Sequence, residues 1–208
     1  ENRMSVRQAF CAGKLFDAHQ PPAGSATRHL LRNAANCHNL KRGQQDGSEV
    51  WLGDPMEAAL RDFAVRHGAC GDAPRRGELA FDSDRRRMSV IVDDGGARWL
   101  YCKGAPEVVL QLCAQVDHDG GAIPLDDEGV QQVARVQEAM ADSGLRVLAF
   151  AYRKLAPGDI PAERDLVFSG LIGLHDPPRP EVPEAMARCR SAGIKVIMVT
   201  GDHPHTAL

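Results

Sequence analysis

The sequence predicts an α+β fold, in which helices flank an antiparallel sheet, followed by the first part of an α/β unit. Short apolar runs on either side of the turn Asp94–Gly96 predict neighbouring antiparallel strands. Apolar residues at helical spacing after Pro55 and after Asp127 predict the flanking helices. Near the end of the chain, the apolar run at residues 194–199 is typical of a buried strand in a parallel sheet.

Composition excludes several classes of protein. The 208 residues, 43% of them hydrophobic, can form one large domain or two small ones. Because the formal net charge is −3, no basic field for nucleic acid is expected, and no apolar run approaches the ~18 residues that a membrane span requires. The six cysteines form no C-x-x-C pair and no zinc-ligand cluster with histidine, so reduced thiols and no metal site are expected.

The chain begins at Glu1 without an initiator Met and stops at Leu208, after a predicted strand and loop. We expect it to be a piece of a larger protein, and to be monomeric. Its first 46 residues are polar and weakly patterned, and they predict short helices joined by loops.

The helix signal is clearest near Asp54, which can cap a helix that Pro55 opens and Gly68 ends. Glu57 stands at the capping-box position of this helix. Five strands are predicted at residues 79–81, 88–92, 97–102, 145–152 and 166–174, and three further helices at 106–112, 127–142 and 181–191. The stiff Pro177-Pro178 pair predicts a boundary between a domain at 1–174 and an incomplete one at 175–208.

Two strand-end patterns suggest an anion site, although each has a simpler explanation. Lys103-Gly104 combines an ammonium group, an unhindered backbone and a helix N-terminus, which suits phosphate, or else Lys103 is an ordinary surface residue. Thr200-Gly201-Asp202 would project from the carboxyl end of a buried strand, where α/β sheets bind ligands, or else Asp202 only caps the next helix.

A third pattern places Phe81 beside a charged turn that contains Arg85, Arg86 and Arg87. An aromatic ring with guanidinium groups suits a base and its phosphates, and the alternative is a core phenylalanine followed by a solvated charge run. Arg146, at the head of a strand, and Glu57 are ambiguous in the same way.

Five motifs, in the family's order and over nearly the whole chain, closely resemble the P-type cation-transporting ATPases, and most of all the branch of calcium pumps and sodium/potassium pumps. They are Gly53-Asp54-Pro55-x-Glu57-x-Ala59-Leu60, Phe81-Asp82-Ser83-x-Arg85-x-x-Met88-Ser89-Val90, Lys103-Gly104-Ala105-Pro106-Glu107, Asp176-Pro177-Pro178-Arg179 and Thr200-Gly201-Asp202. The resemblance implies a nucleotide-binding domain followed by a partial phosphorylation domain of the haloacid-dehalogenase-like (Rossmannoid) type.

The resemblance also implies a role for individual residues. Phe81 would stack on adenine and Glu57 would meet its exocyclic amine, while Lys103, in the motif with Gly104, would line the inner pocket. Arg86 occupies a position usually held by lysine, and Arg146 would reach toward the phosphates. Calcium pumps carry an arginine two residues after the phenylalanine, where this chain has Ser83.

In the second domain, the resemblance places Thr200, Gly201 and Asp202 near the transferred phosphate and its magnesium. Asp176, Pro177 and Pro178 would form part of the hinge. The cofactors implied are ATP and, in the intact parent, Mg²⁺.

The function implied is the positioning of ATP for phosphoryl transfer to an aspartate in an Asp-Lys-Thr-Gly-Thr motif that this sequence lacks, so the chain alone would not turn over. Its partners would be the other cytoplasmic and transmembrane domains of the pump, at the cytoplasmic face of a membrane. The alternatives are a soluble haloacid-dehalogenase-type phosphatase, which would need a nucleophilic Asp motif, and a non-catalytic interaction module.

Overall fold

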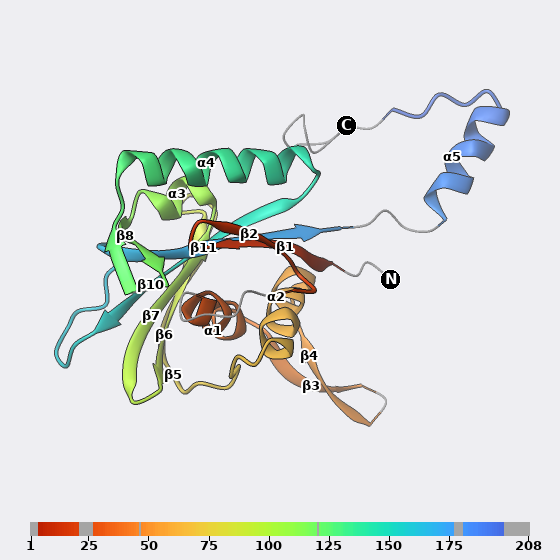
Figure 1. Ribbon diagram of the computed structural model, residues 1–208. Coiled ribbons are helices and arrows are strands. Elements are labelled where there is room, and N and C mark those ends of the chain that lie inside the picture. The colour runs from red at the N-terminus through yellow and green to blue at the C-terminus, as the bar shows by residue number, and fades with distance from the viewer. Residues whose placement is uncertain (1–3, 21–26, 46, 120, 177–180, 198–208) are drawn as a thin grey trace.

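The computed structural model of the protein describes residues 4–20, 27–45, 47–119, 121–176 and 181–197 (Figure 1). Within these residues, nine strands form one sheet, in which only β8 and β11 pair in parallel and the other pairs are antiparallel. The strand order is β2 (Lys14–Asp17), β1 (Ser5–Cys11), β11 (Leu166–His175), β10 (Arg146–Leu155), β7 (Ala97–Gly104), β6 (Arg87–Asp94) and β5 (Arg75–Asp82), with β8 (Cys113–His118) and β9 (Gly121–Pro124) attached beside β11. The hairpin of β3 (Lys41–Gln45) and β4 (Ser48–Leu52) is separate.

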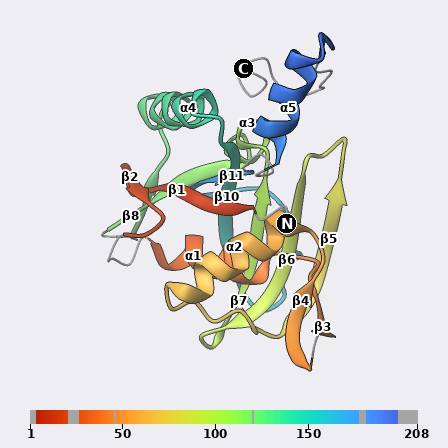
Figure 2. The same cartoon turned by 90° about the vertical axis from the view of Figure 1, so that its right-hand side faces the viewer.

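Helices cover both faces of the sheet, as the sequence predicts. Figures 1 and 2 show α1 (Thr27–Asn36) and α2 (Pro55–Arg66) side by side on one face, and α3 (Pro106–Leu110) and α4 (Asp127–Asp142) on the other. Each face has its own apolar core, which contains Leu30 and Phe63 under the first pair and Val109 and Met140 under the second. Burial of such side chains contributes about 1.5–3 kcal/mol each to folding.

Side chains alternate between these two faces along β6 and β7. Met88 and Val90 of β6 pack on the face of α1, whereas Ile91 packs on the face of α3. In β7, Tyr101 shares the α1 face and Cys102 the α3 face. Because side chains alternate, only every second residue of these strands lies on the face of the sheet that α1 and α2 cover.

The structure corrects the expectation of short helices and loops for residues 1–46. The described part of that segment contains β1, β2 and β3, with α1 between them. Strand β1 pairs with β11, so that Ser5 lies opposite His175. A strand whose partner is so distant in sequence leaves only a weak local pattern, because its stabilising contacts are non-local.

A second correction concerns the buried strand predicted at residues 194–199. Residues 194–197 form no strand, and Ile194, Val196 and Ile197 are exposed, while residues 198 and 199 lie outside the described part of the chain. In the described residues no strand pairs with this segment, so its backbone has no ladder partner. Helix α5 (Val182–Ser191), which precedes it, buries no side chain.

None of the described helices combines the length and the apolar character that crossing a membrane would require.

Candidate functional site

A cleft of about 600 Å³ lies where the N-terminal end of α2, the β5–β6 turn, the end of β7 and the start of β10 meet. Its volume falls in the range of small-molecule sites, roughly 300–1,000 Å³. All six residues that the sequence assigned to nucleotide binding line it, although they are scattered over the chain from position 57 to position 146: Glu57, Phe81, Arg86, Lys103, Gly104 and Arg146. The other lining residues are Asn39, Asp54, Met56, Met88, Ala105, Pro106, Val147 and Leu148.

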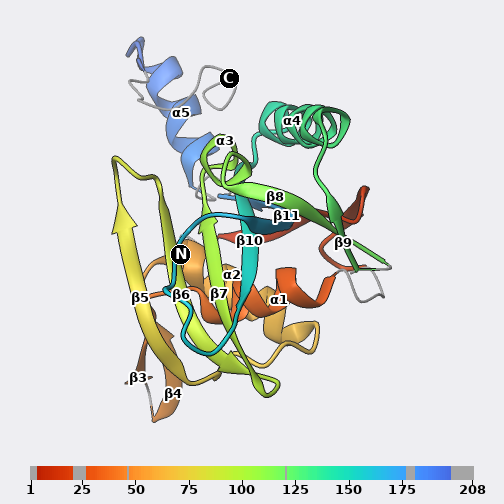
Figure 3. The ribbon, with the colours of Figure 1, turned by 90° about the vertical axis from the view of Figure 1, so that its left-hand side faces the viewer.

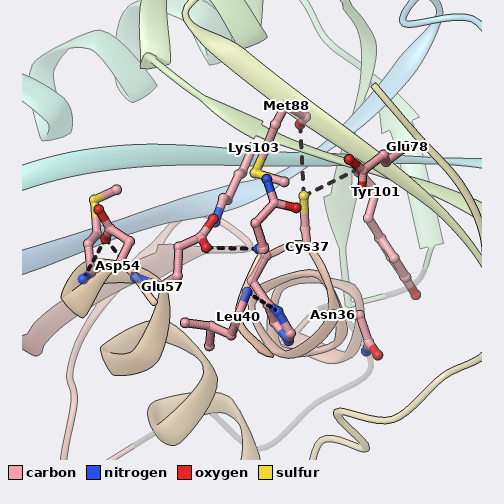
Figure 4. Close-up of polar contacts among 12 residues, drawn as sticks. Asn36, Cys37, Leu40, Asp54, Glu57, Glu78, Met88, Tyr101 and Lys103 are labelled. Carbon is pink, nitrogen blue, oxygen red and sulfur yellow. Dashed lines mark hydrogen bonds and ion pairs between the residues drawn. The ribbon is translucent and has the colours of Figure 1, made fainter. Parts of the chain in front are cut away.

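An ion pair between Lys103 and Glu57 lies at the wall of this cleft. Lys103 Nζ is 2.8 Å from Glu57 Oε1, and the two residues are only 4% and 8% exposed (Figure 4). The second carboxylate oxygen, Oε2, accepts a hydrogen bond of 2.8 Å from the backbone N–H of Asn39. Both oxygens therefore have a protein donor, which offsets the cost of burying the charge.

Helix α2 brings Glu57 to this position because its first turn is fixed by a cap. Asp54 Oδ1 accepts hydrogen bonds from the N–H groups of Met56 and Glu57, and Pro55 occupies the first turn. The predicted cap is thus confirmed. The carboxylate of Glu57, however, binds Lys103 and Asn39, so this residue serves the cleft and not the capping box.

Phe81 is 61% exposed and lines the cleft because β5 contains an irregularity. Leu79 pairs with Ser89 and Asp82 with Arg87, so three steps along β5 oppose two along β6. A regular strand would place Phe81 on the face that Leu79 occupies, whereas the extra residue shifts the alternation and re-aims the ring. An exposed aromatic ring at the edge of an apolar cleft can stack on a flat ligand.

Arg86 and Gly104 lie close together at the end of the β6–β7 pair. Arg86 adopts left-handed backbone with a φ of 47°, and its carbonyl oxygen accepts a hydrogen bond from Ala105 N–H at 3.0 Å. A Cβ on Gly104 would lie 2.5 Å from that oxygen, so glycine is required for this close approach. The guanidinium of Arg86 pairs with Glu107 at 2.6 Å, and both side chains are about half exposed.

A buried thiol, that of Cys37, lies near Lys103 without lining the cleft. Its Sγ lies 3.8 Å from the carbonyl oxygen of Met88 and 3.7 Å from that of Tyr101 (Figure 4). Burial raises the pKa of Cys37 to about 12, although nearby Lys103 acts in the opposite direction. The thiol therefore stays protonated at neutral pH, and it is a packing group and not a nucleophile.

Comparison with known proteins identifies the family. The family model described as "P-type ATPase, cytoplasmic domain N" matches residues 26–181. The chain belongs to the P-type cation-transporting ATPases. The calcium-transporting ATPase of Bacillus subtilis is 36% identical over all of this chain, calcium-transporting ATPase 1 of Lactococcus lactis is 35% identical, and cation-transporting ATPase pma1 of Synechocystis is 40% identical. The chain spans 26%, 24% and 26% of these relatives, about a quarter of their length.

Several predicted residues of this P-type ATPase domain lie outside the described part of the chain. They are the predicted catalytic residues Thr200, Gly201 and Asp202 and the hinge residues Pro177 and Pro178. Asp176 is described and follows β11 directly, in an exposed position. The partial haloacid-dehalogenase-like domain that they would belong to stays a prediction.

Sequence reasoning gave no role to Asn39, a polar residue that lines the cleft. This residue follows α1 in the segment expected to form short helices and loops, and no motif marks it. Its role depends on the hydrogen bond that its N–H donates to Glu57, 18 positions later in the chain. A backbone donor carries no signal in the sequence, because every residue other than proline has one.

Proposed function

We propose that this chain is the ATP-binding domain of a P-type cation-transporting ATPase and that the cleft beside α2 holds the nucleotide. The observation that carries the proposal is the convergence of the six predicted residues on one cleft of about 600 Å³. The residue types fit ATP, because the cleft combines an exposed aromatic ring, two arginines and a buried ion pair.

In this proposal each side chain has a separate task. Phe81 stacks on adenine, and the carboxylate of Glu57, held by Lys103, accepts a hydrogen bond from the exocyclic amine. Arg86 and Arg146 face the phosphates, whose charge they neutralise. Gly104 keeps the wall narrow enough for the β5–β6 turn to lie against it.

The intact pump would transfer the γ-phosphoryl group of ATP to an aspartate outside this sequence, mainly by positioning and charge neutralisation. The chain would bind ATP without turning it over. Residues 1–174 would form the nucleotide-binding domain, and Asp176, Pro177 and Pro178 would belong to the hinge to the phosphorylation domain at 175–208. Its partners would be the remaining domains of the pump, at the cytoplasmic face of the membrane.

The described residues offer no metal site that is built from protein side chains alone. No group of three or more histidine, cysteine, aspartate or glutamate side chains in the described ranges could hold a metal ion. In this proposal Mg²⁺ therefore belongs to the intact parent, and no step here depends on it.

The test is a titration of the 208-residue chain with ATP, followed by backbone amide shifts and by calorimetry. Phe81→Ala is expected to weaken ATP binding about tenfold, since stacking on an aromatic ring contributes about 1.4 kcal/mol or more. Amides near Phe81, Lys103 and Arg146 should shift on addition of ATP.

The matched control is Ile160→Ala, which removes an apolar side chain that is 83% exposed and does not line the cleft. It should leave the affinity unchanged. Equal affinities for the parent chain and Phe81→Ala would contradict the stacking role. No response to millimolar ATP would contradict the whole proposal and would favour a non-catalytic module.

A further inference from the structure

A single carboxylate, that of Glu163, binds three side chains of the segment that follows Phe81. Its oxygens accept hydrogen bonds from Arg85 Nη2 at 2.5 and 2.6 Å, from Arg87 Nε at 2.7 Å and from Ser89 Oγ at 2.7 Å. The side chain of Glu163 is only 7% exposed. Both oxygens therefore have charged donors in a site largely shielded from water, where such hydrogen bonds are strongest.

Glu163 lies on the far face of the sheet from the ion pair of Lys103 and Glu57. Figure 3 shows the connection between β10 and β11, which carries Glu163, running along β6 and β7. Arg87 and Ser89 of β6 point toward it, whereas Met88 between them lines the cleft on the opposite face. Glu163 is not among the residues that line the cleft, so it can act on a ligand there only through other residues.

The turn that Glu163 holds is the one that presents Phe81 and Arg86. Asp82 Oδ1 accepts hydrogen bonds from the N–H groups of Asp84 and Arg85, and Arg86 N–H donates to Asp82 O at 2.7 Å. Arg86 lies between the two arginines that bind Glu163, in left-handed backbone that costs free energy for a residue other than glycine. A strained turn of this kind needs fixed neighbours on both sides.

We infer that Glu163 is a positioning residue for the cleft: by binding Arg85 and Arg87 from behind β6, it fixes the turn that carries Phe81 and Arg86 in its ligand-ready conformation. The inference rests on the proposed ATP site and adds a residue to it. It also assigns Arg85 and Arg87 to the architecture of the turn, so Arg86 is the one arginine of this run that lines the cleft. A turn that is ordered before binding spares the ligand the cost of ordering it.

Glu163→Gln tests the inference, because it keeps the shape of the side chain and removes its charge. The variant is expected to bind ATP about threefold to tenfold more weakly than the parent chain, since the turn loses its preferred conformation. A charge effect alone has the opposite sign: removing a negative charge near the cleft favours an anionic nucleotide. The amides of residues 81–86 should also shift in the ATP-free variant.

Two further variants make the test specific. Asp159→Asn makes the same chemical change on the same connection, where Asp159 accepts a hydrogen bond from Ala156 N–H, and it should leave ATP affinity unchanged. Arg85→Lys keeps the positive charge but loses the planar guanidinium, whose Nη2 bridges both oxygens of Glu163 while Nη1 donates to the carbonyl oxygen of Ala80. A single ammonium group cannot hold both partners in this geometry, so the variant should weaken ATP binding as Glu163→Gln does. If Glu163→Gln does not fold, the ATP affinity of Arg85→Lys tests the inference in its place.

The inference is overturned if the folded Glu163→Gln or Arg85→Lys variant binds ATP within about twofold of the parent chain. It is also overturned if the ATP affinity of Glu163→Gln falls while the amide signals of residues 81–86 stay unchanged. A loss of ATP affinity in Asp159→Asn as large as that in Glu163→Gln would overturn it as well. If the proposed function is wrong and the chain does not bind ATP, the result is different, because the parent chain itself would then show no response to ATP.

Discussion

The ion pair of Glu57 and Lys103 differs from the exposed ion pairs of the protein in its burial and not in its distance. Arg76 and Asp93 approach to 2.6 Å, closer than the 2.8 Å of the buried pair, but their side chains are 56% and 32% exposed. An exposed pair is screened by water and contributes about 0–1 kcal/mol. A buried pair also costs desolvation, so its partners depend on each other.

Lys103→Met is expected to lower the free energy of unfolding by about 3 kcal/mol or more, because it leaves the carboxylate of Glu57 buried without its countercharge. Arg76→Met, the matched change in the exposed pair, should cost less than about 1 kcal/mol. Urea denaturation of the 208-residue chain measures both.

The double variant Lys103→Met with Glu57→Gln serves as the control for this prediction. It removes both charges and should recover part of the loss caused by Lys103→Met alone. Equal losses for Lys103→Met and Arg76→Met would contradict the idea that burial makes the pair interdependent.

Among the elements, helix α2 contributes to the cleft in two ways: it supplies the carboxylate of Glu57, and its capped first turn fixes where that carboxylate lies. Its cap at Asp54 fixes the first turn, and that turn sets the position of Glu57 opposite Lys103. Helix α4 has a comparable cap, in which Asp126 Oδ1 accepts a hydrogen bond from Gly129 N–H at 2.8 Å. The two helices therefore permit a comparison between a cap at the cleft and one away from it.

Asp54→Ala and Asp126→Ala are each expected to lower the free energy of unfolding by about 1 kcal/mol, the ordinary contribution of a side-chain cap. Only Asp54→Ala should shift the amide signals of Glu57 and Lys103, because Asp126 is not part of the cleft. Chemical denaturation and amide spectra of the two variants check this. An unchanged stability for Asp54→Ala would show that the cap contributes nothing to α2.

The elements that the sequence predicted correctly are those whose signals are local. The hairpin of β6 and β7 has a glycine turn between two apolar runs, and α4 has its cap and its apolar stripe within 16 residues. Short helices were expected in residues 1–46, but the position of α1 was not predicted, because its inner face carries Asn33, whose side chain donates to the carbonyl oxygens of Cys102 and Ala151. A polar residue satisfied by distant backbone interrupts the apolar pattern that marks a helix.

For the molecule as a whole, His29, His38 and Asp117 have pKa shifts large enough to contribute to the pH dependence of stability between pH 4 and 6.5. Burial, together with nearby arginines, lowers the pKa of His29 and of His38 to about 4. Burial raises the pKa of Asp117 to about 6. The histidines therefore bind fewer protons in the folded state than in the unfolded state between pH 4 and 6.5, whereas Asp117 binds more between pH 3.8 and 6.

Stability is expected to fall as the pH is lowered from 6.5 to 4, because two histidines that resist protonation outweigh one aspartate that favours it. The sign follows from proton counting: where the unfolded state binds more protons, acid favours unfolding. Asp117 alone would give the reverse, with stability lost as the pH rises through about 6. Urea denaturation at several pH values measures the slope.

His29→Phe isolates one of these groups. It retains an aromatic ring to stack on Tyr152, whose ring centroid lies 3.8 Å from that of His29, but it cannot take up a proton. The variant should lose less stability between pH 6.5 and 4 than the parent chain does, whatever its stability at neutral pH. The exposed His19→Phe is the control, and an identical slope for His29→Phe and the parent chain would rule out a contribution from His29.

The sequence could predict the cleft only where a motif marks its residues. Glu57, Phe81, Arg86, Lys103, Gly104 and Arg146 were predicted, and they gather at one cleft. Asn39 and Glu163 were not predicted, because each acts through a contact with residues 18 or more than 70 positions away. Such contacts follow from the topology of the sheet, which no local pattern specifies.

The pairing of Ser5 with His175 has a mechanical consequence. Strands β1 and β11 run antiparallel, so the chain enters the sheet and leaves it at adjacent points of one ladder. A force that separates these points loads the ladder's hydrogen bonds one after another, as a zipper opens, and not all at once. A force that moves both points together loads none of these hydrogen bonds.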